Sequence, residues 1–221
     1  MDNKKTVAVC GMMTSPRYVN CLCRDHIDAA FVGCGIPLQN TQGVFYGQCM
    51  QRMLVGAVEQ GVEIAVVCDG DSLFTSADIM RLVTTLEAND HIDALASMQI
   101  RRGNRTMLAS VAGKSSVEID GTPLKVTTAH FGLTVIDLRK LGEVEKPWFF
   151  SKPDEKGEWG DKRIDDDIWF WKQWERAGNT VYLDPQTRIG HLEEMVVMVD
   201  PTTYEAVHAY PGEWIDSCKS N

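Results

Sequence analysis

Short apolar runs alternate with segments of helical periodicity along the first hundred residues. Continuous apolar runs predict buried strands, and apolar positions three and four apart predict helices that pack one face against a sheet. The predicted order is strand, helix, helix, strand, helix, strand, at residues 6–10, 18–30, 44–60, 63–68, 77–88 and 94–98. Ser15 and Pro16 have the order of an N-cap and a first helical residue before the first helix. This spacing predicts a doubly wound α/β layer.

The second half of the sequence has a less regular pattern. The predicted elements are a hairpin turn at Asp120 and Gly121, a strand at 133–136, a polar loop at 151–163, a helix at 166–177, and short strands at 180–183 and before His191. The Gly-, Lys- and Glu-rich loop is a candidate lid, because mobile loops on a rigid scaffold often carry function. The segment after Glu193 has no pattern that predicts an element.

Composition fits a globular domain with a substantial core. The chain has 221 residues, of which 44% are hydrophobic and 24% charged, which excludes disordered, collagen-like and coiled-coil classes. Its formal charge of -9 argues against a large nucleic-acid interface, which needs clustered Lys and Arg. No apolar stretch is long enough to span a bilayer and no signal peptide is visible, so we expect a cytoplasmic protein, in the host cytoplasm if a phage encodes it. Seven scattered cysteines indicate reduced thiols.

Asp69, Gly70 and Asp71 directly follow the apolar run 63–68. In an open α/β sheet, ligands bind outside the carboxyl ends of the strands, so both carboxylates are expected to face a crevice. A divalent cation is the usual reason to hold two such charges together. A plain strand-to-helix turn is the alternative, because Asp and Gly are common turn residues.

A second acidic cluster, Asp165, Asp166 and Asp167, opens an aromatic-rich helix. Acidic residues at a helix N-terminus are favoured by capping and by the helix dipole, which needs no catalytic role. One aspartate is enough for capping, however, and three adjacent ones repel each other. The triplet therefore indicates that one of them accepts a proton or meets a substrate. His191 alone is more typical of a structural histidine, and gains meaning only together with these acids.

Five features in this order resemble the GT-A fold of glycosyltransferases, and above all the small family 2-like enzymes of phages and bacteria. They are the Asp-x-Asp after an internal strand, the stretch 130–136, the tripeptide 147–149, the run 165–170 and the segment 177–191. The likeness covers about residues 6–192. It implies a GT-A, Rossmann-like fold, with a mixed, mostly parallel sheet flanked by helices in a single domain.

The resemblance also implies how the chain is organised. Residues 1–195 would form the catalytic domain, with a nucleotide-binding half at about 1–100 and an acceptor half at about 101–195. Residues 196–221 would form a C-terminal extension.

The resemblance implies a metal site and a general base. Asp69, Asp71 and His191 would be ligands of Mn2+ or Mg2+, which bridges the two phosphates of a nucleotide-sugar. Asp167 corresponds to the aspartate that deprotonates the acceptor hydroxyl in inverting members of the family. Asp166 takes the place of a glutamate, which is one methylene longer, so the assignment of the base between Asp166 and Asp167 stays open.

The resemblance further implies a donor site beside the end of the first strand. The expected nucleotide-sugar contacts are Met13, Thr14, Arg17, Arg52, Asp69 and Gly70, together with Gly132 beside the donor sugar. Arg17 and Arg52 also have the plain alternative of solvated surface residues.

The implied reaction moves a sugar from a nucleoside-diphosphate sugar, by family habit a UDP-sugar, to an acceptor hydroxyl. The sequence leaves glycan, protein, metabolite and modified DNA base open as acceptors, and it leaves the oligomeric state open. Three other readings stay open: a haloacid-dehalogenase-like phosphatase, a nucleotidyltransferase, and a non-catalytic module that binds nucleotide-sugars. The phosphatase motif normally lies on the first strand, and the nucleotidyltransferase needs a basic glycine-rich loop after that strand, of which residues 11–17 are a poor version.

Overall fold

The computed structural model describes residues 8–15, 19–101, 106–111, 119–200, 202–213 and 215. The helices are α1 (Cys21–Cys34), α2 (Tyr46–Glu59), α3 (Ser76–Glu87), α4 (Asp166–Arg176) and the 3-10 helix η1 (Leu138–Glu143). The strands are β1 (Val9–Ser15), β2 (Leu38–Gln42), β3 (Ile64–Asp69), β4 (Ser72–Leu73), β5 (Ala94–Met98), β6 (Ala109–Ser110), β7 (Leu124–Val126), β8 (Thr128–Ala129), β9 (Leu133–Asp137), β10 (Val181–Arg188), β11 (Gly190–His191), β12 (Val196–Val199) and β13 (Ala206–Ala209).

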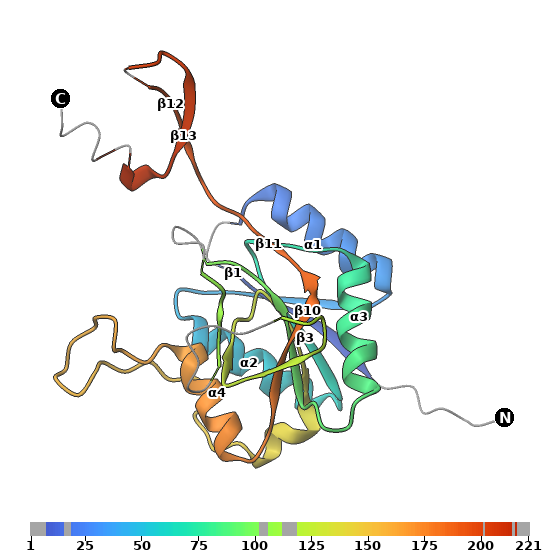
Figure 1. The fold of residues 1–221 in the computed structure, drawn as a ribbon. Helices are drawn as coiled ribbons and strands as arrows, with labels where there is room; N and C mark the ends of the chain where they lie inside the picture. The colour runs from blue at the N-terminus through green and yellow to red at the C-terminus, as the bar shows by residue number, and fades with distance from the viewer. Residues whose placement is uncertain are drawn as a thin grey trace.

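A seven-stranded sheet forms the centre of the molecule, in the order β2, β1, β3, β9, β5, β10, β7 (Figure 1). Strands β2, β1, β3, β5 and β10 point one way, whereas β9 and β7 run in the opposite direction. Helices α1 and α3 cover one face, and α2 and α4 cover the other. The predicted fold class, a mixed and mostly parallel sheet flanked by helices in a single domain, is confirmed.

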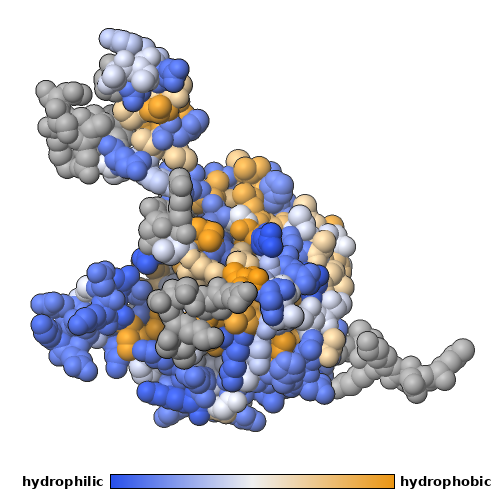
Figure 2. Space-filling model, viewed as in Figure 1, coloured by the Kyte–Doolittle hydropathy of each residue, from blue (hydrophilic) through white to orange (hydrophobic). Residues whose placement is uncertain are grey.

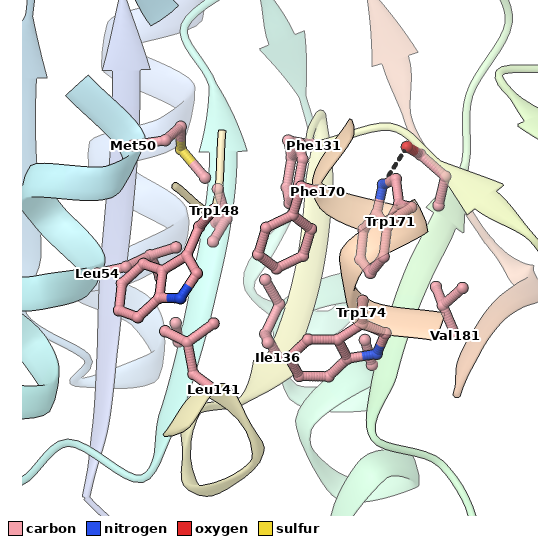
Figure 3. Packing of buried hydrophobic residues seen from close by; sticks show 14 of the residues in the cluster. Met50, Leu54, Phe131, Ile136, Leu141, Trp148, Phe170, Trp171, Trp174 and Val181 are labelled. Atoms are coloured by element: carbon pink, nitrogen blue, oxygen red, sulfur yellow. Dashed lines mark hydrogen bonds between the residues drawn. The ribbon is translucent and has the colours of Figure 1, made fainter. Parts of the chain in front are cut away.

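Two hydrophobic layers hold the sheet between the helices. On the α1 and α3 side, Phe31 and Leu82 pack against buried residues of β3 and β9. On the other side, Phe131, Phe170 and Trp171 fill the space between α4 and the sheet (Figure 3). Trp171 stacks on Phe131 with ring centroids 5.2 Å apart, and its indole N–H donates to the Ala129 carbonyl at 2.6 Å. This layer fixes the position of α4, and with it the aspartates at the N-terminus of that helix.

The first helix begins later than predicted. Ser15 is the last residue of β1, and Asn20 caps α1 by accepting a hydrogen bond from the Leu22 N–H at 2.9 Å. Strand β1 continues through Gly11, where a Cβ would lie 2.3 Å from the Phe31 ring, so glycine lets strand and helix approach closely. The prediction that Ser15 is the N-cap is therefore wrong, and Pro16 lies outside the described residues.

Two further differences come from tertiary pairing, while the turn predicted at Asp120 is present. The segment between α1 and α2, for which the pattern predicts no element, contains β2, which pairs with β1. The continuous apolar run of β3 is typical of a parallel sheet, but β9 inserts antiparallel between β3 and β5. The Asp120 carboxylate accepts from the Thr122 N–H at 2.9 Å and so forms the predicted turn, whereas residues 112–118 before it are not described.

Two segments project from the body of the molecule. The loop after Ser151 is hydrophilic, returns through a bridge between Lys152 and Ile164, and contains the exposed Trp159; its role as a lid stays a prediction. Strands β12 and β13 form a hairpin arm beyond the predicted catalytic domain, and Figure 2 shows apolar side chains on it. Val197 and Val199 there are 64% and 61% exposed.

The described cysteines are all free thiols. Within the ranges that the structure describes, no helix combines the length and apolar character that a membrane crossing requires.

We predict that Trp171→Ala lowers the free energy of unfolding by about 3–5 kcal/mol, because it removes a fully buried ring and its hydrogen bond. Trp159→Ala, at a residue that is 60% exposed, is the matched control and should stay within about 0.5 kcal/mol of the parent. Urea unfolding followed by circular dichroism measures both. Equal losses in the two variants would show that the α4 layer is not the stabilising core.

Candidate functional site

A cavity of about 1110 Å³ lies at the carboxyl ends of β1 and β3. Of the residues predicted for the site, those that line it are Thr14, Asp69, Gly70, Asp71, Asp166, Asp167 and His191. The cavity therefore brings together residues that lie up to 177 positions apart in the sequence, as do Thr14 and His191.

Three predicted contacts among the described residues do not line this cavity. The Met13 side chain is fully buried in the α1 and α3 layer, because neighbouring residues of a strand point to opposite faces and Thr14 takes the outward position. Arg52 is exposed on α2 and does not line the cavity. Gly132 is buried behind the cavity wall. Arg17 lies outside the described residues.

Asp69 ends β3 and is held by the neighbouring strand. The Thr14 hydroxyl donates to Asp69 Oδ1 at 3.1 Å, and the Gly70 N–H donates to the Thr14 carbonyl at 3.0 Å. Burial and, as a smaller cause, the negative charge of Asp71 together raise the pKa of Asp69 to about 7, while the Thr14 hydrogen bond acts in the opposite direction. A positive charge in the cavity would relieve this repulsion.

Two short paired strands bring Asp71 and His191 together: Asp71 directly precedes β4, and His191 ends β11. In the β4 and β11 ladder His191 lies opposite Ser72, and the Leu192 N–H donates to the Asp71 carbonyl at 2.8 Å. This pairing places His191 Nε2 3.4 Å from Asp71 Oδ2. His191 Nδ1 lies 3.0 Å from the Ile100 carbonyl, which can only accept, so Nδ1 carries a proton. Nε2 is then the nitrogen that faces the Asp71 carboxylate.

This arrangement fits a divalent cation in part. Among the residues that the structure describes, no three His, Cys, Asp or Glu side chains converge as a complete metal centre. A carboxylate beside an imidazole whose other N–H is bound to a carbonyl is, however, the donor arrangement typical of metal-binding histidines. Mg2+ at nucleotide sites takes one or two carboxylates and completes its shell with phosphate oxygens and water. The donors present thus fit an ion that is shared with a phosphorylated ligand.

The three adjacent aspartates have different partners. Asp165 pairs with Arg163 at 2.7 Å. Asp166 accepts a hydrogen bond from the Gly47 N–H at 2.8 Å, in the first turn of α2, and another from the Ser151 hydroxyl. Asp166 therefore joins α4 to α2 and to the projecting loop. Such a carboxylate is occupied by structural hydrogen bonds.

The Asp167 side chain accepts a hydrogen bond only from its own chain neighbour among the described contacts, and so joins no other element. Its Oδ1 accepts from the Ile168 N–H at 2.7 Å, and it lines the cavity. Burial raises the pKa of Asp167, and the negative charge of Asp165 adds to this effect. A carboxylate that is shielded from water and carries a raised pKa is suited to accept a proton.

Tyr46 is a cavity residue that the sequence did not indicate. It begins α2 and packs against Phe131 and Phe149, with ring centroids 6.3 Å from each. Burial raises the pKa of Tyr46 well above its usual value, and the charges of Asp69 and Asp167 raise it further. The phenol therefore stays protonated and supplies a neutral hydroxyl among the acids. The sequence could not indicate Tyr46, because a tyrosine at the start of a helix is common and its acidic neighbours are distant along the chain.

The charge of the cavity limits which ligands it can hold. Its acidic lining residues are Asp69, Asp71, Asp165, Asp166, Asp167, Glu193 and Glu194, and no Lys or Arg of the described residues lines it. Tyr210 and Pro211, which follow the hairpin arm, complete part of the wall. An anionic ligand needs a cation to enter such a site.

His130 is a buried histidine in the cavity wall. Its Nδ1 accepts from the Gly132 N–H at 2.9 Å, so Nε2 carries the proton and donates to the Ser97 carbonyl at 2.7 Å. Burial lowers the pKa of His130 to about 4, which keeps the ring neutral near pH 7.

Comparisons with known proteins give a fold and no family. No protein-family model matches the chain, and no curated protein matches it. The crystal structure of A197 from STIV matches with a TM-score of 0.62 at 12% identity, over 90% of this chain and 93% of that chain. The mannosyltransferase PcManGT from Pyrobaculum calidifontis, in complex with GDP-Man and Mn2+, matches with a TM-score of 0.46 at 12% identity, over 88% of this chain and 58% of that one. The likeness to A197 shows a shared fold.

We predict that His130 makes the protein sensitive to acid. The pKa of His130 is 6.5 in the unfolded chain and about 4 in the folded protein. The contribution of the neutral ring to the free energy of unfolding is therefore complete above pH 6.5 and is lost as the pH drops to 4. Between pH 7 and pH 5 this amounts to about 2 kcal/mol. Urea unfolding at both pH values should show that the loss on acidification is smaller by about this amount in His130→Gln. An unchanged loss in the variant would contradict the assignment.

Proposed function

We propose that this chain is a metal-dependent glycosyltransferase that moves a sugar from a nucleoside-diphosphate sugar to an acceptor hydroxyl, with inversion at the anomeric carbon. The observation that carries the proposal is that one acidic cavity holds the Asp71 and His191 pair, Asp69, and the partly shielded Asp167. The choice of a UDP-sugar as donor rests on the sequence resemblance alone.

The donor end of the site would be formed by the β3 and β4 junction. Asp71 and His191, with Asp69 beside them, would hold Mn2+ or Mg2+, and Thr14 and Gly70 would lie against the nucleotide. When bound, the ion supplies positive charge against the two phosphates while the bond from sugar to phosphate breaks. The phenol of Tyr46 stays protonated, and so adds a hydrogen-bond donor without adding negative charge.

The acceptor end would be formed by the N-terminus of α4. The Asp167 carboxylate takes the proton of the acceptor hydroxyl as the hydroxyl oxygen attacks the anomeric carbon. The bond to the diphosphate breaks, and its electron pair leaves with the nucleoside diphosphate. Asp166 is assigned a positioning role, because both of its carboxylate oxygens accept structural hydrogen bonds. We further propose residues 1–195 as the catalytic domain and 196–221 as an extension whose Tyr210 contributes to the cavity wall.

The first test is donor turnover. The protein is incubated with Mn2+ and a panel of UDP-, GDP-, ADP- and dTDP-sugars, and release of nucleoside diphosphate is measured. We expect slow release from one nucleotide class, and loss of release on chelation of the metal. Release of inorganic phosphate from simple phosphoesters, with no nucleoside diphosphate formed, would instead support the phosphatase reading.

We predict that Asp71→Ala weakens Mn2+-dependent binding of the nucleoside diphosphate by at least about tenfold, because it removes a ligand of the shared ion. Isothermal titration with and without Mn2+ measures this. Asp154→Ala, at an acidic residue of the projecting loop that does not line the cavity, is the control and should bind like the parent. Equal binding by Asp71→Ala and the control would remove Asp71 from the metal site.

We predict that Asp167→Asn keeps donor binding and lowers the turnover number by about 10²–10⁴-fold, because proton abstraction and leaving-group stabilisation are separate tasks. Asp166→Asn should lower the free energy of unfolding and affect turnover less. The measurements are single-turnover kinetics with the donor found in the panel, and urea unfolding. Parental turnover in Asp167→Asn would exclude it as the base.

A further inference from the structure

A buried polar cluster lies beneath the two short strands that carry the proposed metal ligands. Gln99, directly after β5, is 3% exposed, and Ser72 is fully buried. Gln99 Nε2 donates to Ser72 Oγ at 3.1 Å and to the Gly190 carbonyl at 3.4 Å. One amide group thus joins β4 and β11 by hydrogen bonds to both strands.

These contacts lie next to Asp71 and His191, and Gln99 itself lines the cavity. Ser72 directly follows Asp71, and Gly190 directly precedes His191. The residue after Gln99 is Ile100, whose carbonyl lies 3.0 Å from His191 Nδ1. The same two-residue segment therefore holds both the backbone before His191 and its imidazole ring. A shift of Gln99 would change the 3.4 Å distance between His191 and Asp71.

Gly132 provides the space that this amide occupies. A Cβ at Gly132 would lie 2.4 Å from Gln99 Oε1 and 2.8 Å from Gln99 Nε2, far closer than atoms can approach. The Gly132 backbone is itself fixed, since its N–H donates to His130 Nδ1 at 2.9 Å. Any larger residue at position 132 would therefore have to displace the Gln99 amide. This accounts for a glycine here without a contact to a sugar.

We propose that Gln99 is a positioning residue that sets the Asp71 and His191 pair for metal binding, and that Gly132 is required because it makes room for the Gln99 amide. The inference rests on the proposed function for the role of the pair. The geometric part concerns the protein alone: the Gln99 amide holds the backbone beside the pair, and so keeps the Ile100 carbonyl on the His191 ring.

The first experiment separates the effect of the Gln99 hydrogen bonds from the effect of its packing. Gln99→Met keeps a side chain of similar size and removes both hydrogen bonds. Mn2+ affinity is measured from the electron paramagnetic resonance signal of free Mn2+, with and without UDP. We expect a loss of about 10–100-fold in affinity. Gln186→Met is the matched control, because its amide also donates to a backbone carbonyl, that of Gly121 at 2.8 Å, but does not line the cavity. It should bind Mn2+ like the parent.

The second experiment tests whether Gly132 acts through Gln99. Gly132→Ala should lower Mn2+ affinity about as much as Gln99→Met does, but should cause less than about a twofold further loss when added to Gln99→Ala, where the clash is absent. Gly142→Ala, at a position with open space around it, is the control. Equal losses from Gly132→Ala in both backgrounds would overturn the proposed link.

A third readout does not depend on the metal. The ring ¹⁵N shifts of His191 in the metal-free protein report which nitrogen carries the proton. We expect Nδ1 to carry a proton in the parent, because it lies 3.0 Å from the Ile100 carbonyl, and a smaller share of protonated Nδ1 in Gln99→Met and Gly132→Ala. If the parent binds no Mn2+ while these shifts change as expected, the proposed function fails and the positioning role stands. Unchanged shifts in both variants would overturn the positioning role itself.

Discussion

Repulsion between carboxylates is the constraint on which the site depends. Asp69 and Asp71 are held near one another at the end of β3, and burial together with this repulsion raises the pKa of Asp69 to about 7. The site stays assembled because hydrogen bonds from uncharged donors hold its parts. These are the bond from the Thr14 hydroxyl to Asp69, the ladder between β4 and β11, and the bond from the Gln99 amide to Ser72. Because no donor in these bonds is positively charged, the negative charge of the carboxylates is not neutralised by the protein and remains available to a ligand.

The rigidity of the α4 side of the cavity has a different origin. Asp167 occupies its place because α4 is fixed by large aromatic rings, with Phe170 and Trp171 in contact with Phe131. Aromatic pairs in such offset and edge arrangements contribute stability beyond the area that they bury. Asp166 adds a hydrogen bond from the N-terminus of α2. The two halves of the cavity are therefore supported separately, one by a polar network and one by packing.

The parts of the fold that depend on local pattern could be predicted from the sequence. The apolar run of β3 ending at Asp69, and the helix opened by the aspartate triplet, are both present. The antiparallel insertion of β9 was not predictable, because pairing partners are chosen by tertiary contacts rather than by the strand's own residues. The cap of α1 was misassigned because Ser15 satisfies the local rule as well as Asn20 does, and the extension of β1 through Gly11 decides between them.

The same limit applies to the site. Position after a strand was enough to predict that Asp69 and Asp71 face a cavity, and both line it. Arg52 was a candidate because of its charge, but its side chain is on an exposed face of α2. Tyr46 and Gln99 carry no sequence signal, because their importance comes from neighbours that are distant along the chain.

The hairpin arm has a consequence that follows from how it is attached. A two-stranded ribbon is only marginally stable by itself in water, and Val197 and Val199 leave this one with solvated apolar side chains. Its order therefore depends on its base, where Tyr210 and Pro211 form part of the cavity wall. A molecule that binds in the cavity and contacts Tyr210 would stabilise the ribbon. By thermodynamic reciprocity, a partner that binds the ordered ribbon would raise the affinity of the cavity for that molecule.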